Sequence, residues 1–153
     1  MRQLLTTGTR GNPTIDSLSV DAIAYLSQVI EKVGIKGVAI PSSTTINASD
    51  GSIHYYDVAT AANWSINITD TIDLNTSLDV GQAITVVVMA TQSDPAYYNN
   101  TAVTVDGSAA TVSWLGGTAP AAGTVDGIDV YTYTVMKTAD ATFTVIASIN
   151  AYA

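Results

Sequence analysis

The sequence predicts a mainly β protein, an antiparallel β-sandwich or jelly roll with an N-terminal extended arm and one short helix. Three observations predict this class. Apolar and polar residues alternate with a period of two from residue 38 onward, turn signals separate the short runs, and Thr and Val, which suit pleated strands, are abundant. With 153 residues, of which 47% are hydrophobic, the chain can bury the core of one domain.

Residues 1–16 are predicted to form the arm, because several glycines and Pro13 interrupt any regular periodicity. Arg2 and Arg10 in this arm are candidates for pairing with carboxylates of a partner. A frayed terminus without a partner is the alternative.

Residues 17–34 are predicted to form the helix. Ile23, Leu26 and Ile30 follow one another at spacings of three and four, which places them on one face. Gly34 is a natural stop after the last turn. The apolar stripe is too short for a free coiled coil, so we expect it to pack on the β domain or on copies of itself around a symmetry axis.

Residues 38–153 are predicted to form the β domain. Asp106-Gly107 predicts a hairpin turn, because both residue types tolerate a positive φ. Thr104–Gly107 recurs as Thr124–Gly127, which predicts two turns of one type. The expected strands lie near residues 38–40, 44–48, 52–59, 63–69, 83–91, 101–105, 110–115, 128–136 and 141–150.

The charge distribution narrows the classes of partner. The net charge is −8, and only 12% of residues are charged. Residues 1–36 contain four basic and three acidic residues, a net charge of +1. The remainder contains one Lys and ten Asp, a net charge of −9. An acidic body disfavours binding to the nucleic-acid backbone. A low density of charge suits a surface that is buried in an assembly.

Membrane insertion and cofactor binding are not expected either. The longest apolar run, residues 84–90, is too short to span a bilayer, and the N-terminus lacks the apolar core of a secretory signal. The absence of Cys excludes disulfides, thiolate nucleophiles and Cys-based metal sites. We expect no cofactor and no membrane partner.

Catalysis is also disfavoured. His54, the only histidine, lies in a predicted strand, and Asp57 three residues later falls on the opposite face, so a hydrogen-bonded strand histidine at a surface or interface is favoured over a general base. Asp126 and Asp129 have the residue type of a glycosidase pair, but they bracket a turn in an Asp-rich chain. We expect that the protein is not an enzyme.

One acidic segment is a candidate cation site. Asp70, Asp73 and Asp79, with Asn75, supply oxygens of the kind that Ca²⁺ prefers. Their spacing lacks the pattern of a calcium loop. A polar turn is therefore the favoured interpretation.

Two adjacent tyrosines are a candidate binding platform. Tyr97 and Tyr98 follow Pro95 in a predicted loop, and exposed rings of this kind stack on the C–H faces of sugars. The favoured alternative is that Trp64, Trp114 and about half of the tyrosines anchor the core or an interface.

An ordered series of motifs runs through residues 50–153. Val80–Val88 reads VGQAITVVV, and His54-Tyr55-Tyr56 and Ala61–Asn67 precede it. The motifs that follow are Ala96-Tyr97-Tyr98, VDGSAATVSW at 105–114, GGTAP at 116–120 with Gly123, DVYTYT at 129–134, Lys137-Thr138 and ATFTV at 141–145. In this order the series resembles a C-terminal β-module of bacteriophage virion structural proteins, of the cyanophage-like tail-fibre and capsid-decoration type.

The resemblance implies a non-enzymatic, symmetric β-module on the surface of a virion, usually a homotrimer. The chain is too short for the long shaft of a fibre, so the first hypothesis is a capsid cement or decoration protein that stabilises the phage shell. The alternative is a tail-fibre or adhesin module in the tail that binds host-surface glycan. The expected partners are other copies of the chain and a phage capsid or tail protein. The residues expected at interfaces are Arg2, Arg10, Ile23, Leu26, Ile30, Tyr97 and Tyr98.

Overall fold

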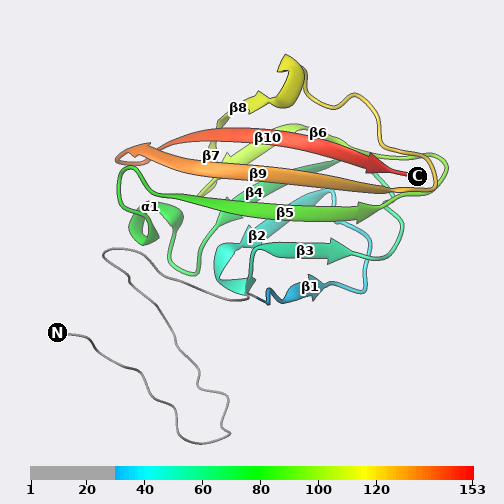
Figure 1. Ribbon diagram of the computed structural model, residues 1–153, viewed down its shortest axis with the longest axis horizontal. Helices are drawn as coiled ribbons and strands as arrows, with labels where there is room; N and C mark the ends of the chain where they lie inside the picture. The colour runs from blue at the N-terminus through cyan, green and yellow to red at the C-terminus, as the bar shows by residue number, and fades with distance from the viewer. Residues whose placement is uncertain (1–29) are drawn as a thin grey trace, which may run out of the picture. The chain divides into compact units, whose positions relative to one another are not determined.

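The structure, a computed structural model, describes residues 30–153, which form a sandwich of two β-sheets (Figure 1). The helical turns are η1 (Ala48–Asp50), α1 (Leu74–Ser77) and η2 (Leu115–Gly117). The strands are β1 (Val33–Ile35), β2 (Ser43–Asn47), β3 (Ile53–Tyr56), β4 (Trp64–Thr69), β5 (Ala83–Thr91), β6 (Asn99–Val105), β7 (Ser108–Ala109), β8 (Thr111–Trp114), β9 (Ile128–Ala139) and β10 (Thr142–Tyr152).

The chain alternates between the two sheets from β1 to β6. One sheet has six strands in the order β1-β3-β5-β9-β10-β8, and the other has four in the order β2-β4-β6-β7. Within one sheet β1, β3 and β5 pair in parallel, and within the other β2, β4 and β6 do so. β9 pairs antiparallel with both β5 and β10. In Figure 1, β5, β9 and β10 run side by side across the view.

The predicted mainly β class is confirmed, but the direction of several strands differs from the antiparallel pairing that we expected. Both sheets are mixed. The six-stranded sheet combines the parallel pairs of β1, β3, β5 and β8 with the antiparallel pairs of β9, and the four-stranded sheet adds the antiparallel β7 to the parallel β2, β4 and β6. A turn signal between two strands predicts that the chain reverses. It does not indicate whether the next strand joins the same sheet or crosses to the opposite one, and here the first five connections cross.

The core consists of the inward side chains of both sheets. Trp64 from β4 meets Tyr131 from β9 edge to face, with ring centroids 4.9 Å apart and planes at 78°. Tyr131 stacks along β9 on Tyr133, and Trp114 from β8 contacts Tyr133 at 6.1 Å. These contacts join three strands, and each large side chain buried in this way contributes roughly 1.5–3 kcal/mol. The prediction that the tryptophans and several tyrosines anchor the core is confirmed.

Strand β9 also fixes both ends of the sandwich. Its inward residues begin with Asp129 and end with Lys137, and both are buried. The Lys137 ammonium donates to the carbonyl oxygens of Asn75 and Leu78, so it holds the segment around α1. A buried cation is tolerated here because backbone carbonyls replace its water.

The N-terminal part of the prediction is wrong where the structure describes it. Residues 17–29 of the expected helix and the whole arm lie outside the described residues. Ile30–Lys32 have no regular structure, and Val33–Ile35 form β1, so no helix continues to Gly34. β1 pairs in parallel with β3. A segment of only three residues gives no sequence signal for pairing with a strand about 20 residues later. The predicted strand at 38–40 is absent, although Ile40 is part of the core.

The Asp106-Gly107 hairpin is confirmed, and its aspartate has a second role. Both residues have a positive φ, 50° and 76°, between β6 and β7. The Asp106 carboxylate accepts hydrogen bonds from the Thr69 hydroxyl at 2.8 Å and from the backbone amides of Leu74 and Asn75 at 2.9 and 3.0 Å. The hairpin thus orients the start of α1.

The recurrent motif does not form a second turn of the same type. Asp126 has a φ of 54°, but Gly127 is not in the left-handed region. A side chain at Gly127 would collide with the carbonyl oxygen of Tyr152. Glycine is needed there for close approach of the last strand, not for backbone conformation.

Replacing Asp106 by Ala should lower the free energy of unfolding by about 3 kcal/mol, because three donors lose their acceptor and the left-handed backbone becomes unfavourable. Asp106→Asn should cost less, since it keeps one acceptor oxygen. Asp126→Ala is the matched control: it pays the same backbone cost of about 1 kcal/mol, but its carboxylate is exposed. Urea unfolding of the three variants measures the difference, and equal losses for both Ala variants would refute the role of the carboxylate.

Candidate functional site

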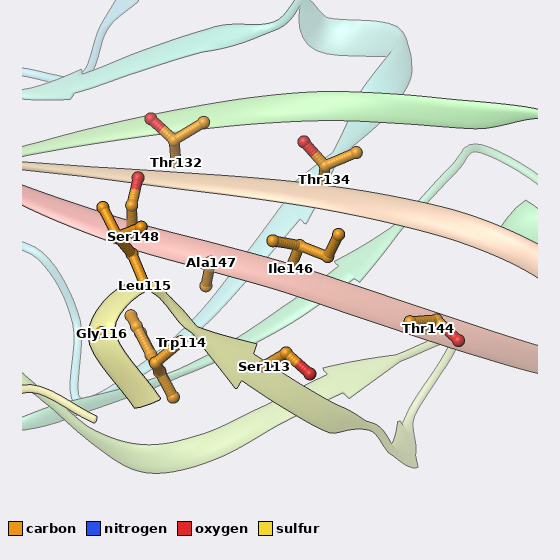
Figure 2. Close-up of a pocket in the computed structure, with 10 residues that line it drawn as sticks. All are labelled: Ser113, Trp114, Leu115, Gly116, Thr132, Thr134, Thr144, Ile146, Ala147 and Ser148. Carbon is orange, nitrogen blue, oxygen red and sulfur yellow. The ribbon is translucent and has the colours of Figure 1, made fainter. Parts of the chain in front are cut away.

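A groove of about 570 Å³ lies on the outer side of the six-stranded sheet, next to the edge strand β8 (Figure 2). We call it the outer groove. Strands β8, β9 and β10 and the turn η2 supply its walls. Its lining residues are Ser113, Trp114, Leu115, Gly116, Thr132, Thr134, Thr144, Ile146, Ala147 and Ser148.

Strand alternation places hydroxyl and hydrocarbon groups side by side on the floor of the outer groove. Thr132 and Thr134 of β9 pair with Ser148 and Ile146 of β10, and Figure 2 shows these four side chains on one side of their strands. The Thr134 hydroxyl lies 3.1 Å from the hydroxyl of Thr85 on β5. This cross-strand hydrogen bond fixes the Thr134 hydroxyl and leaves its methyl group on the same face.

Strand β8 and η2 form the rim. Ser113 pairs with Ile146 and faces the groove, whereas Trp114 turns its ring toward Tyr133 in the core. Gly116 has a φ of 77°, which lets the chain turn sharply after β8. Leu115 stands out at this turn with 76% of its surface exposed. The rim therefore adds an exposed aliphatic side chain to a floor of hydroxyls.

This lining is suited to contact rather than to chemistry. Its side chains are hydroxyl, aliphatic and aromatic, and none of the ten lining residues titrates near neutral pH. Acid–base catalysis needs a titratable group within reach of the reacting atom. Across residues 30–153, no three His, Cys, Asp or Glu side chains gather as a metal site. Hydroxyls beside hydrocarbon instead match another protein surface or a neutral polar ligand.

His54 lies inside the sandwich. It is buried on the inward side of β3, its Nε2 is 2.9 Å from the carbonyl oxygen of Gly51, and its Nδ1 has no partner. Burial lowers the pKa of His54; nearby Lys36 acts in the same direction, while the hydrogen bond to Gly51 and the charge of Asp50 oppose it. The predicted hydrogen-bonded strand histidine is confirmed, but its surface position is wrong.

The acidic segment forms a polar turn. Hydrogen bonds from the Ser49 and Ser77 hydroxyls and from the Thr71 amide hold the pKa of Asp70 below its ordinary value. The Asp73 carboxylate instead accepts from the Thr76 amide at the start of α1. The two carboxylates accept hydrogen bonds from different local donors and do not converge on one point, as the polar-turn interpretation predicts.

Asp126 and Asp129 do not form a catalytic pair. Asp126 is exposed, whereas Asp129 is fully buried. One Asp129 oxygen accepts hydrogen bonds from the Gln92 side chain at 3.0 Å and from the Thr124 amide at 3.1 Å. Gln92 also exchanges two hydrogen bonds with the backbone of Tyr97. Asp129 thus acts as a buried support for the Tyr97 loop.

The predicted interface residues are not gathered at the outer groove. Tyr97 and Tyr98 are half-buried in the loop before β6, and the Tyr98 amide donates to the Asn63 side chain at 3.1 Å. Ile30 is the first described residue and belongs to no helix or strand. Arg2, Arg10, Ile23 and Leu26 lie outside the described residues. The sequence pattern missed the outer groove, whose only signal was Ile146 among outward Thr and Ser residues of the last strand.

The buried His54 predicts a specific pH dependence of stability. The unfolded chain keeps a pKa near 6.5, and burial lowers the folded value, so the unfolded state binds more protons between the two. The free energy of unfolding should therefore fall as the pH drops below about 6.5 and level off above it. His54→Gln should remove this slope while keeping a donor to Gly51. Urea unfolding of both proteins between pH 5 and 8 measures it, and identical slopes would contradict the assignment.

Comparison with protein-family models, curated proteins and solved structures found no match for this chain. Within residues 30–153, no helix has the length and apolar character needed to cross a membrane.

Proposed function

We propose that the protein is a structural component of a bacteriophage particle, a capsid cement or decoration protein that stabilises the shell as a homotrimer and has no enzymatic activity. The observation that carries the proposal is the outer groove, a contact surface of hydroxyl and hydrocarbon groups on a β-sandwich. The ordered motifs of residues 50–153, which resemble phage virion modules, support the same assignment.

The physical properties of the domain fit a surface-mounted part. Interlocked aromatic rings from both sheets hold the sandwich, so its outer surfaces are presented with little loss of conformational freedom on binding. Only 12% of the residues are charged, which lowers the cost of removing water from the contacts. Arg2 and Arg10 are proposed to anchor the arm on a neighbouring subunit or on the shell.

The alternative is an adhesin module of the tail that binds host-surface glycan. The buried hydrogen bonds of Asp129 and Gln92 favour it, because they fix the backbone of Tyr97 before any ligand arrives. Preorganised loops of this kind bind at a lower entropic cost.

Copy number separates these two functions. A decoration protein should be present in hundreds of copies per particle, since the shell repeats it, whereas a tail adhesin should number from a few to a few tens. Quantitative mass spectrometry of purified particles, with the major shell protein as internal standard, gives the ratio. A low ratio, together with glycan-array binding that Tyr98→Ala abolishes, would replace the first function by the second.

Deleting residues 1–15 should reduce the amount of protein bound to particles while the β domain stays folded. The expected loss is at least tenfold if the arm contributes about 1.4 kcal/mol or more to attachment. The double substitution Arg2→Ala/Arg10→Ala is the matched variant, because it removes the charges and keeps the length. Undiminished occupancy of the truncated protein would refute an anchoring role of the arm.

A further inference from the structure

The two outer sides of the sandwich differ in chemistry. The four-stranded sheet turns short polar side chains outward, namely Ser43, Thr45, Ser65, Asn67, Thr69 and Thr104. The six-stranded sheet turns large apolar side chains outward among its threonines, including Ile35, Ile53, Val87, Val130, Ile146 and Tyr152. Since both sheets come from one chain, its overall composition does not explain why only the six-stranded sheet turns large apolar side chains outward. We call the outward side of the six-stranded sheet the uncharged face.

The apolar groups on the uncharged face form connected rows. Ile35 pairs with Tyr55, Tyr55 with Met89 and Met89 with Val130, so their side chains follow one another across four strands. At the other end, Met89, Ile128, Val130 and Tyr152 line a second hollow of about 450 Å³. Ile35, Ile146 and Tyr152 are 66%, 49% and 60% exposed. Such a continuous patch is unusual for a surface that stays in water.

Charge limits the surfaces through which two copies can approach each other. Residues 30–153 contain eleven acidic and three basic residues, a net charge of −8, so copies repel one another at most orientations. No outward residue of the six strands is charged, and the charged residues Asp129 and Lys137 of β9 point inward. A basic partner would be attracted to the acidic turns instead. The strands of the four-stranded sheet carry no charged residue either, so charge permits contact through either sheet, and the exposed apolar side chains of the six-stranded sheet mark its face as the one that other copies would cover.

The size of the uncharged face is sufficient for stable association. Spacings of about 4.8 Å between strands and about 3.3 Å per residue give the six strands a face of roughly 700 Å². A standard interface buries about 600–1,000 Å² on each partner, a range that includes this face. Homo-oligomer interfaces are also more apolar than transient ones, and this face is the more apolar of the two outer sides of the sandwich.

We propose that further copies of this chain cover the uncharged face, so that the six-stranded sheets of all copies face the symmetry axis of the homo-oligomer. This inference rests on the structural function proposed above and names the surface that the assembly uses. Hydroxyl and methyl groups of one face contact those of the neighbouring faces, and Ile146 at the outer groove lies in the contact.

Ile146→Glu should weaken the assembly, because a carboxylate would be buried against an uncharged surface without a partner. The full chain, 15.8 kDa per copy, is measured by light scattering and mass photometry over a dilution series. We expect the concentration at half dissociation to rise at least about tenfold. Ile72→Glu is the matched control, since Ile72 is 74% exposed and lies outside the six strands. Ile146→Thr keeps the β-branched side chain that strands favour, and it should weaken assembly less.

Thiol labelling gives a second readout that does not depend on a disruptive charge. The chain has no Cys, so Thr134→Cys places a single thiol on the uncharged face, and Thr45→Cys places one on the opposite side of the sandwich. In the Thr134→Cys variant, the rate of thiol labelling should be at least about tenfold lower at concentrations at which the protein assembles than in dilute protein. Labelling at position 45 should not change.

The outcomes are distinguishable. A monomer at every concentration would overturn this inference, and so would an oligomer that Ile146→Glu leaves intact and in which position 134 is labelled as fast as in dilute protein. In the second case the proposed structural function would stand with a different interface. An oligomer that dissociates in Ile146→Glu but is absent from purified particles would confirm the face and refute the phage function.

Discussion

Strict alternation along β9 is the constraint on which the rest of the sandwich depends. The strand lies between β5 and β10, so each inward residue is fixed by partners on both sides. Its inward column contains a carboxylate at one end, two stacked tyrosines in the middle and an ammonium group at the other end. These groups hold the Tyr97 loop, the core and the α1 segment, respectively. The outward column of the same strand supplies the floor of the outer groove.

The sequence predicts the strands well because burial on one side produces a period of two that is visible in any single segment. Residues 83–91 are predicted without error, and Trp64 and Trp114 are identified correctly as anchors of the core. The crossings between sheets were not predictable, since they depend on contacts between segments far apart in the chain. The recurrent Asp-Gly motif shows the same limit: Gly107 serves backbone conformation and Gly127 serves packing against Tyr152.

The candidate site was less predictable than the fold. The sequence identified His54 and Asp129 as candidate residues but not their burial inside the sandwich. The outer groove, however, combines Ser113, Thr132 and Ile146 from three strands. None of these residue types signals a site alone. Only the register that places them in neighbouring rows makes them a surface.

The order of the strands also has a consequence for how the protein is made. β9 and β10 are the last strands of the chain, yet they occupy the middle of the six-stranded sheet between β5 and β8. During synthesis, β5 and β8 therefore emerge before the strands that join them, and the backbone N–H and C=O groups on one edge of β5 stay unpaired until β9 has been made. Closure of the sandwich therefore follows the synthesis of β9 and β10 and depends on long-range pairing, which folds slowly and leaves nascent chains vulnerable to aggregation.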